Sequence, residues 1–258
     1  MSRALARIGS KLPKGWGDAG RQIGILIGVD IVYELGRGIA DSNKTDAMAH
    51  GAQVIDFEQA THTFFEPSLQ AFFLPAHWLI DVANQLYLNA QFSIALGFLV
   101  WLYVFRNESY YFVRNMFVVS MCLALIGYIG YPTAPPRMFP EHGFVDTITD
   151  FSSVNHDSAL VKVFINPYAA IPSMHCCFAL MIGVTGVRVS RHRATKVFWA
   201  LWPLLVVWVV IVTANHYWID AALGALVAAL AALFAASLAR ARPEAWAFRR
   251  RQPRTAEA

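Results

Sequence analysis

The sequence predicts an all-α protein of the membrane, a bundle of six membrane-spanning helices with an extracytoplasmic interfacial cap. Of its 258 residues, 57% are hydrophobic and only 15% are charged. Long apolar runs recur along most of the chain, and the basic residues gather in the flanks between those runs. Ordinary soluble domains carry about 25% charged residues, so this composition excludes that class.

Six apolar runs are expected to form the bundle, several of them long enough to cross about 30 Å of hydrocarbon. They are Ile23–Ile39, Trp78–Phe105, Phe112–Tyr131, Ser173–Val189, Val197–Ala214 and Ile219–Ala239. The first run contains Asp30, Glu34 and Arg37, so it could instead pack inside the bundle with its charges on an internal face. These charges also favour a retained span over a cleaved signal peptide.

The lysines and arginines predict the orientation, because the cytoplasmic flanks of membrane spans are enriched in positive residues. Most of the 21 basic residues lie before the first run, after the second, after the fourth or after the sixth. Both termini, residues 1–22 and 241–258, are therefore expected in the cytoplasm as basic segments. Residues 23–240 form the expected membrane domain, with its core at 78–240, and the composition suggests a bacterial cytoplasmic membrane.

The basic segments are expected to meet anionic lipid headgroups rather than nucleic acid, because no motif that reads a groove accompanies them. Two longer polar segments, residues 41–76 and 132–172, then lie outside the cytoplasm. The first is rich in phenylalanine and is expected to form an interfacial helix or cap. The second begins with Pro132, Pro135 and Pro136, which end a helix and place Arg137 at the outer surface.

A histidine and an aspartate lie together where the fifth run meets a polar loop. Asp220 follows His216 by four residues, so its carboxylate can reach the imidazole within one helical turn. A carboxylate that orients a histidine in this way prepares it to act as a nucleophile. This pair predicts covalent catalysis at the outer membrane boundary.

A second histidine, His175, lies at an expected helix start after Pro172 and Ser173. Its imidazole can donate a proton, and the helix N-terminus attracts anions. With Arg137 it predicts transfer of a phosphoryl group, because a phosphate needs fixed donors around its oxygens. Two histidines and a carboxylate could instead bind zinc, but the arginine favours an anion, so no metal or cofactor is expected.

The candidate phosphate-binding residues are Arg137, Ser173 and Asn215, and each has a structural alternative. Arg137 could extend to lipid headgroups, and Ser173 could only cap its helix. Asn215 could either donate to phosphate or cap the following helix.

These segments resemble the second and third signature motifs of the type 2 phosphatidic acid phosphatase and vanadium haloperoxidase superfamily. The resemblance implies an antiparallel six-helix bundle in which His216 attacks phosphorus, Asp220 orients it and His175 protonates the leaving oxygen. The usual first motif, a lysine seven residues before Arg-Pro, is absent, and Val210 and Met174 stand where an arginine and a glycine are usual. The variant pattern is similar to the branch that includes inositol phosphorylceramide synthases.

The expected function is a metal-independent lipid phosphatase or phosphotransferase that forms a phosphohistidine at the outer membrane face. Its substrate would be a lipid phosphate, pyrophosphate or phosphodiester. An alternative is transfer of an inositol-phosphate-type headgroup to a lipid alcohol. A lipid transporter or an inactive scaffold is the alternative of another class, although no inverted repeat is visible.

Three further residues are candidates for recognition of the headgroup or acceptor: Glu34, Arg37 and Tyr131. Glu34 and Arg37 share one face of the first expected helix, and ionisable groups inside a bundle often line a polar cavity. A purely structural ion pair between the two is the alternative.

Overall fold

The computed structural model describes residues 12–40, 44–151 and 168–241, and over these residues the chain is helical. The predicted all-α class is therefore confirmed. The longer helices are α2 (Gly15–Ala40), α3 (Lys44–Ala60), α6 (Gln91–Phe105), α7 (Asn107–Gly130), α10 (Met174–Val189), α11 (Arg193–Val212) and α12 (Trp218–Ala241). The shorter elements are α4 (Glu66–Phe73), α5 (His77–Gln85), the π-helix η1 (Leu86–Ala90), the 3₁₀ turns η2 (Pro136–Met138) and η3 (Pro140–His142), and α8 (Thr147–Phe151).

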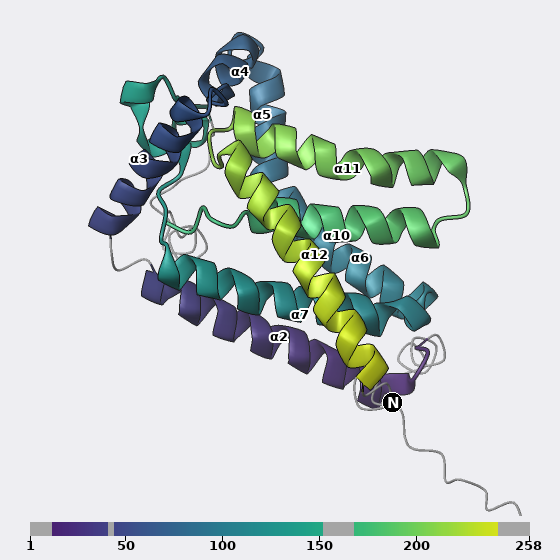
Figure 1. Ribbon diagram of the computed structural model, residues 1–258. Coiled ribbons are helices and arrows are strands. Elements are labelled where there is room, and N and C mark those ends of the chain that lie inside the picture. The colour runs from purple at the N-terminus through teal and green to yellow at the C-terminus, as the bar shows by residue number, and fades with distance from the viewer. Residues whose placement is uncertain (1–11, 41–43, 152–167, 242–258) are drawn as a thin grey trace, which may run out of the picture.

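Helix α10 lies at the centre of the bundle, in contact with α6, α7, α11 and α12. Figure 1 shows α2 running beside α7, and α12 crossing the bundle diagonally. The ends of α7, α11 and α2 and the starts of α10 and α12 lie at the same end of the bundle. The loops that carry the histidines are therefore brought together at that end.

Three helices in the described residues are long and apolar enough to cross a membrane: α7, α11 and α12. They match three of the six expected spans and indicate a membrane protein. The expected span Trp78–Phe105 stays a prediction, because α5 and α6 are bent by 53° around η1 and form at most one broken span. The polar side chain of Asn84 lies in this run and bonds to Thr147, which accounts for a break in an otherwise apolar helix.

The expected spans Ile23–Ile39 and Ser173–Val189 form helices α2 and α10. That these two helices cross the membrane stays a prediction. Helix α10 is apolar but only 16 residues long. Helix α2 has 26 residues, and its Asp18 accepts hydrogen bonds from the hydroxyls of Tyr103 and Tyr111 at 2.9 and 2.8 Å. Asp18 is thus turned toward α6 and α7, but it precedes the run Ile23–Ile39, so these contacts do not test the internal face expected for Asp30, Glu34 and Arg37.

Short elements cover the histidine end of the bundle. Helix α3 packs Ala47, Val54 and Ile55 against Phe139 and Tyr217 in a small apolar core. The amide of Ala134 donates to the carbonyl of Ala47 at 2.9 Å, which joins the proline loop to α3. Figure 1 shows α3 and α4 at this end, where the interfacial cap is expected. The side of the membrane on which this cap lies stays a prediction.

Helices α10 and α12 touch at their amino-terminal ends, and a glycine makes this contact possible. A Cβ atom placed on Gly224 would lie 2.3 Å from the carbonyl oxygen of Ser173. The amide of Ser173 also donates to the carbonyl of Asp220 at 3.1 Å. The residue that precedes the His175 helix is thus held directly against the first turns of the Asp220 helix.

Replacing Gly224 with alanine is expected to lower the free energy of unfolding by about 1–3 kcal/mol, because the new methyl group would overlap the Ser173 backbone. The helix propensity of alanine would offset at most about 1 kcal/mol of this loss. Gly97→Ala in α6 is the matched control, since nothing lies within 4 Å of its added Cβ. Thermal unfolding in detergent compares the two variants, and equal midpoints would contradict the close contact.

Candidate active site

His216 lies in the short connection between α11 and α12, and its position is fixed by the end of α11. The carbonyl of Val210 accepts from the amides of Asn215 and His216 at 3.0 and 3.2 Å. Between the helices Ala214 has a φ of 51°, a left-handed conformation that turns the chain sharply. His216 is only 4% exposed as a result of this turn.

The His216 imidazole has one defined tautomer. Its Nδ1 lies 3.0 Å from the carbonyl oxygen of Ala170 and 3.3 Å from Oδ2 of Asp220. Both neighbours are acceptors, so Nδ1 must carry the hydrogen and Nε2 keeps its lone pair. The four-residue spacing therefore brings Asp220 to His216 as expected, with Asp220 in the first turn of α12.

The environment keeps this imidazole neutral. Burial, together with the positive charge of Arg137, lowers the pKa of His216 from its usual 6.5 to about 3. A neutral imidazole with an unprotonated Nε2 is the form that can attack an electrophile.

His175 faces His216 from the first turn of α10. The centroids of the two imidazole rings are 5.5 Å apart. The ring of Tyr87, from η1, stacks on His175 with centroids 4.3 Å apart and planes inclined by 18°. Tyr87 also meets the edge of His216, at 6.3 Å between centroids. The two histidines thus share one aromatic neighbour and lie close enough to act on the two sides of one phosphorus atom.

Arg137 reaches the site because the proline loop pairs with the segment that precedes α10. Thr133 and Ala169 form an isolated parallel bridge. The amide of Arg137 donates to the carbonyl of Ala214 at 2.8 Å, and its Nη1 donates to Oδ1 of Asn215. The hydroxyl of Tyr87 lies within hydrogen-bonding reach of the guanidinium.

Asn215 and Ser173 are placed beside the histidines, and both make structural contacts. Asn215 accepts from Arg137, and its Nδ2 donates to the carbonyl and hydroxyl oxygens of Thr213 at 3.1 and 2.8 Å. It therefore orients Arg137, a role that neither sequence alternative included. The hydroxyl of Ser173 accepts from the amide of Cys176 at 3.4 Å, so Ser173 caps α10. Phosphate binding by either residue stays a prediction.

The three candidates for headgroup or acceptor recognition separate in the structure. Arg37 donates to Glu34 at 2.8 Å, as the structural alternative expected. Arg37 also lies close enough to His175 and Tyr87 for its charge to act on both. Tyr131 packs instead against α3, where its ring stacks on His50 at 3.9 Å and its hydroxyl donates to Gln53 at 2.9 Å.

The sequence interpretation missed three residues at or behind this site: Tyr87, Glu58 and Glu66. Tyr87 was counted within an apolar span, although Asn84, Gln85 and Asn89 beside it signal an interrupted helix. The two glutamates are fully buried beneath the start of α12. Their neighbours are distant in sequence, so no local pattern identifies them.

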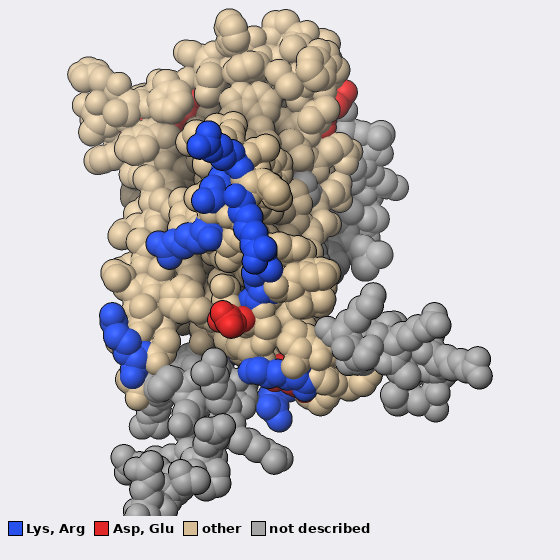
Figure 2. Space-filling model, turned by 90° about the vertical axis from the view of Figure 1, so that its right-hand side faces the viewer, with Lys and Arg blue, Asp and Glu red and all other residues tan. Residues whose placement is uncertain are grey.

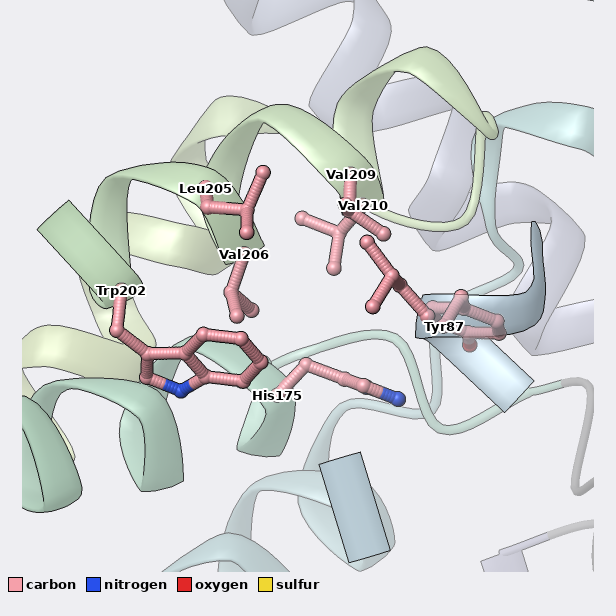
Figure 3. Close-up of a pocket in the computed structure, with 8 residues that line it drawn as sticks. Tyr87, His175, Trp202, Leu205, Val206, Val209 and Val210 are labelled. Atoms are coloured by element: carbon pink, nitrogen blue, oxygen red, sulfur yellow. The ribbon is translucent and has the colours of Figure 1, made fainter. Parts of the chain in front are cut away.

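A narrow apolar pocket leads to His175. Its walls are Leu86 and Tyr87 from η1 and five residues of α11, Trp202, Leu205, Val206, Val209 and Val210. Figure 3 shows His175 reaching into this pocket, with Tyr87 beside it and the side chains of α11 opposite. The imidazole of His175 therefore lies at the end of an apolar surface. Within the described residues, no group of three or more histidine, cysteine or acidic side chains is arranged to hold a metal ion.

Comparison with known proteins identifies the family. The family model of the PAP2 superfamily matches residues 52–234, which is more than half of the chain and includes His175, His216 and Asp220. Searches of the curated proteins and of the solved structures returned no significant match. The matched residues also contain Arg137, Tyr87 and the two buried glutamates. The chain belongs to the PAP2 superfamily, which supports a phosphatase-type function.

Proposed function

We propose that the protein is a lipid phosphatase or phosphotransferase that acts through a phosphohistidine on His216. The substrate is a lipid phosphate, pyrophosphate or phosphodiester at the outer face of the cytoplasmic membrane. One observation carries the proposal. The Nδ1–H of His216 is directed at Ala170 and Asp220, so the free Nε2 is available for attack.

In the first step, Nε2 of His216 attacks phosphorus, and the bond from phosphorus to the leaving oxygen breaks as the P–N bond forms. His175 must be protonated when the anionic substrate binds; it gives this proton to the leaving oxygen and becomes neutral. Asp220 stabilises the positive charge that grows on the imidazole, because it accepts from Nδ1 at 3.3 Å. Arg137 and the amino-terminal end of α10 offer positive charge to the phosphate oxygens.

In the second step, water or an acceptor hydroxyl attacks the phosphorus of the phosphohistidine. His175, now neutral, takes the proton of the attacking oxygen, and the P–N bond breaks. His216 returns to its neutral form with a proton on Nδ1. Because the imidazole is the nucleophile, neither step requires a metal ion. Water as the acceptor makes the protein a phosphatase, and a lipid alcohol makes it a headgroup transferase.

Two features support a lipid substrate and the outer face. The pocket beside His175 is lined mainly by apolar side chains of α11, which suits a chain attached to the phosphate. Arg188, Arg191, Arg193 and Lys196 lie at or beside the α10–α11 turn, at the other end of these helices. Figure 2 shows lysine and arginine side chains gathered on this end. By the positive-inside rule this end is cytoplasmic and the site is outside.

The test is product analysis by phosphorus NMR of the purified protein in chelator, with a panel of lipid phosphates, pyrophosphates and phosphodiesters. We expect turnover that resists the chelator. Free phosphate or phosphomonoester as product identifies a phosphatase. If an added lipid alcohol diverts the product to a phosphodiester, the protein is a transferase. Turnover that the chelator abolishes, or no turnover of any substrate, would contradict the proposal, and the latter result would favour a transporter or scaffold.

A further inference from the structure

Two glutamates are buried together beside the first turn of α12. Glu58 lies near the end of α3 and Glu66 is the first residue of α4. Both side chains are 0% exposed. Fully buried acidic residues are rare unless another group partners them, so this pair needs a physical explanation.

Glu66 is well partnered, and its partners include the start of α12. Its Oε1 accepts from the amide of Trp218 at 2.9 Å, and its Oε2 accepts from the amide of Phe65 at 3.0 Å. The indole nitrogen of Trp218 also donates to the hydroxyl of Thr63 at 3.2 Å. The first amides of a helix have no partner within the helix, so Glu66 satisfies one that α12 cannot satisfy itself.

Asp220 satisfies the neighbouring amide of the same turn. Its Oδ2 accepts from the amide of Tyr217 at 3.0 Å as well as from His216. Glu66 and Asp220 therefore hold successive amides, those of Trp218 and Tyr217. A shift of Trp218 away from Glu66 would move the turn that carries Asp220.

Glu58 lacks the partners that a carboxylate needs. In the described part of the chain neither of its oxygens has a partner at normal hydrogen-bonding geometry, although the nearby backbone amide of Ile219 favours the charged form. Its carboxyl lies beside that of Glu66, and Asp220 adds a second negative charge nearby. Two adjacent carboxylates repel each other, but a protonated Glu58 can donate to Glu66, whose oxygens each have a second lone pair.

The charges around Glu58 all favour its protonated form. Burial first, and then the negative charges of Glu66 and Asp220, raise the pKa of Glu58 from 4.5 to about 9. Glu66 comes from α4 and Asp220 from α12, and Glu141 of η3 adds a negative charge near the adjoining Tyr217. Glu58 thus keeps its proton at neutral pH.

We propose that Glu58 and Glu66 share one proton and that this pair positions the start of α12, keeping Asp220 behind His216. Both are positioning residues, because they act on the reaction only through Trp218 and Asp220. The pair also links α3 and α4 to the first turn of α12, which carries Asp220. The catalytic consequence rests on the function proposed above, whereas the shared proton does not.

The shared proton is tested on the full chain in detergent with Glu58→Gln, an uncharged mimic of the protonated acid that can still donate to Glu66. The unfolded chain binds a proton at Glu58 only below about pH 4.5, whereas the folded protein keeps it until about pH 9. Folding that must retain a proton becomes less favourable as the pH rises through this window. The glutamine variant does not carry this pH-dependent cost.

We therefore measure the thermal midpoints of wild type and Glu58→Gln at about pH 5 and about pH 8.5, both inside this window. The midpoint of Glu58→Gln minus that of wild type is expected to be larger at the higher pH. The infrared C=O band of a buried carboxylic acid should weaken in the same variant at neutral pH. Glu108→Gln is the matched control, because Glu108 is exposed in the first turn of α7. A midpoint difference that does not change with pH, or an unchanged infrared band, would overturn the shared proton.

The positioning role is tested by turnover. Glu66→Gln cannot accept from both Trp218 and Phe65, because one of its two end atoms is now a donor. We expect about 10- to 100-fold lower kcat with little change in KM, since small displacements of catalytic groups cost factors of this size. In wild type, kcat should also fall as the pH passes about 9, and Glu58→Gln should retain its activity there.

Unchanged kcat in Glu66→Gln, or the same alkaline fall in wild type and Glu58→Gln, would overturn the positioning role. If the stability and infrared results are as expected but wild type turns over no substrate, the carboxyl pair is supported and the proposed function fails. The two failures are therefore distinguishable.

Discussion

Replacing His216 with alanine is expected to lower turnover by about 10⁴-fold or more, because the variant has no atom that can form the P–N bond. Nδ1 of His216 is directed at Ala170 and Asp220, so Nε2 is the atom free to act as the proposed nucleophile. The ring centroid of His175 lies 5.5 Å from that of His216, so His175 would have to move to replace His216 as the nucleophile. Initial rates on the best substrate of the panel, measured by phosphate or phosphodiester release, check the prediction.

The matched variant is His216→Asn, whose side-chain amide can place a donor near the position of Nδ1. It should retain the contacts to Ala170 and Asp220 and fold like the wild type, yet be as inactive as the alanine variant. Wild type quenched in alkali during turnover should contain phosphohistidine, and both variants should lack it. Substantial turnover by a folded His216→Asn protein would rule out covalent catalysis by His216.

The part of this site that the sequence predicts is the part built from local contacts. Asp220 follows His216 by four positions, so the end of the short connection and the first turn of α12 bring the two side chains together. Ser173 directly precedes the His175 helix, and the same local reasoning predicts its capping role as one alternative. Such contacts depend on spacing at one helix start and need no knowledge of the tertiary fold.

The rest depends on contacts between residues far apart in sequence. Tyr87 joins the histidines because η1 interrupts an apolar run. Next to η1, Asn84 bonds to Thr147 at the start of α8, 63 positions later in the chain. Glu66 reaches Trp218 across 152 positions of the chain. The sequence around Tyr87 and Glu66 gives no sign of these contacts, because the partner residues are distant in the chain.

The spans show the same division between local and tertiary information. Helices α11 and α12 are apolar along most of their length, with charged residues only near their ends, so composition alone predicts them. Helix α2 carries charged residues, which are unfavourable in a membrane span, so its composition does not predict its place in the bundle. Asp18 finds its tyrosine partners only because α2 packs against α6 and α7. The bend between α5 and α6 likewise reflects tertiary hydrogen bonds that an apolar run conceals.

Asp220→Asn is expected to lower kcat by about 10²–10⁴-fold, as loss of the orienting carboxylate does in other histidine-dependent sites. Oδ2 of Asp220 accepts from both the Tyr217 amide and Nδ1 of His216. An asparagine has one acceptor oxygen, and in the position of Oδ2 that oxygen can accept from both donors. The imidazole proton then stays on Nδ1, which also donates to the Ala170 carbonyl, and the variant lacks the negative charge that stabilises the imidazolium formed during attack.

The measurement separates this effect from a loss of folding or binding. KM should change little because Asp220 is fully buried behind the imidazole and is not expected to touch substrate. Nitrogen NMR of labelled histidine should show the proton of His216 on Nδ1 in both wild type and Asp220→Asn, because the Ala170 carbonyl still accepts from Nδ1. An asparagine variant that retains wild-type kcat would show that the charge of Asp220 is not needed for attack. A variant with low kcat whose His216 proton lies on Nε2 would instead assign the loss to the wrong tautomer.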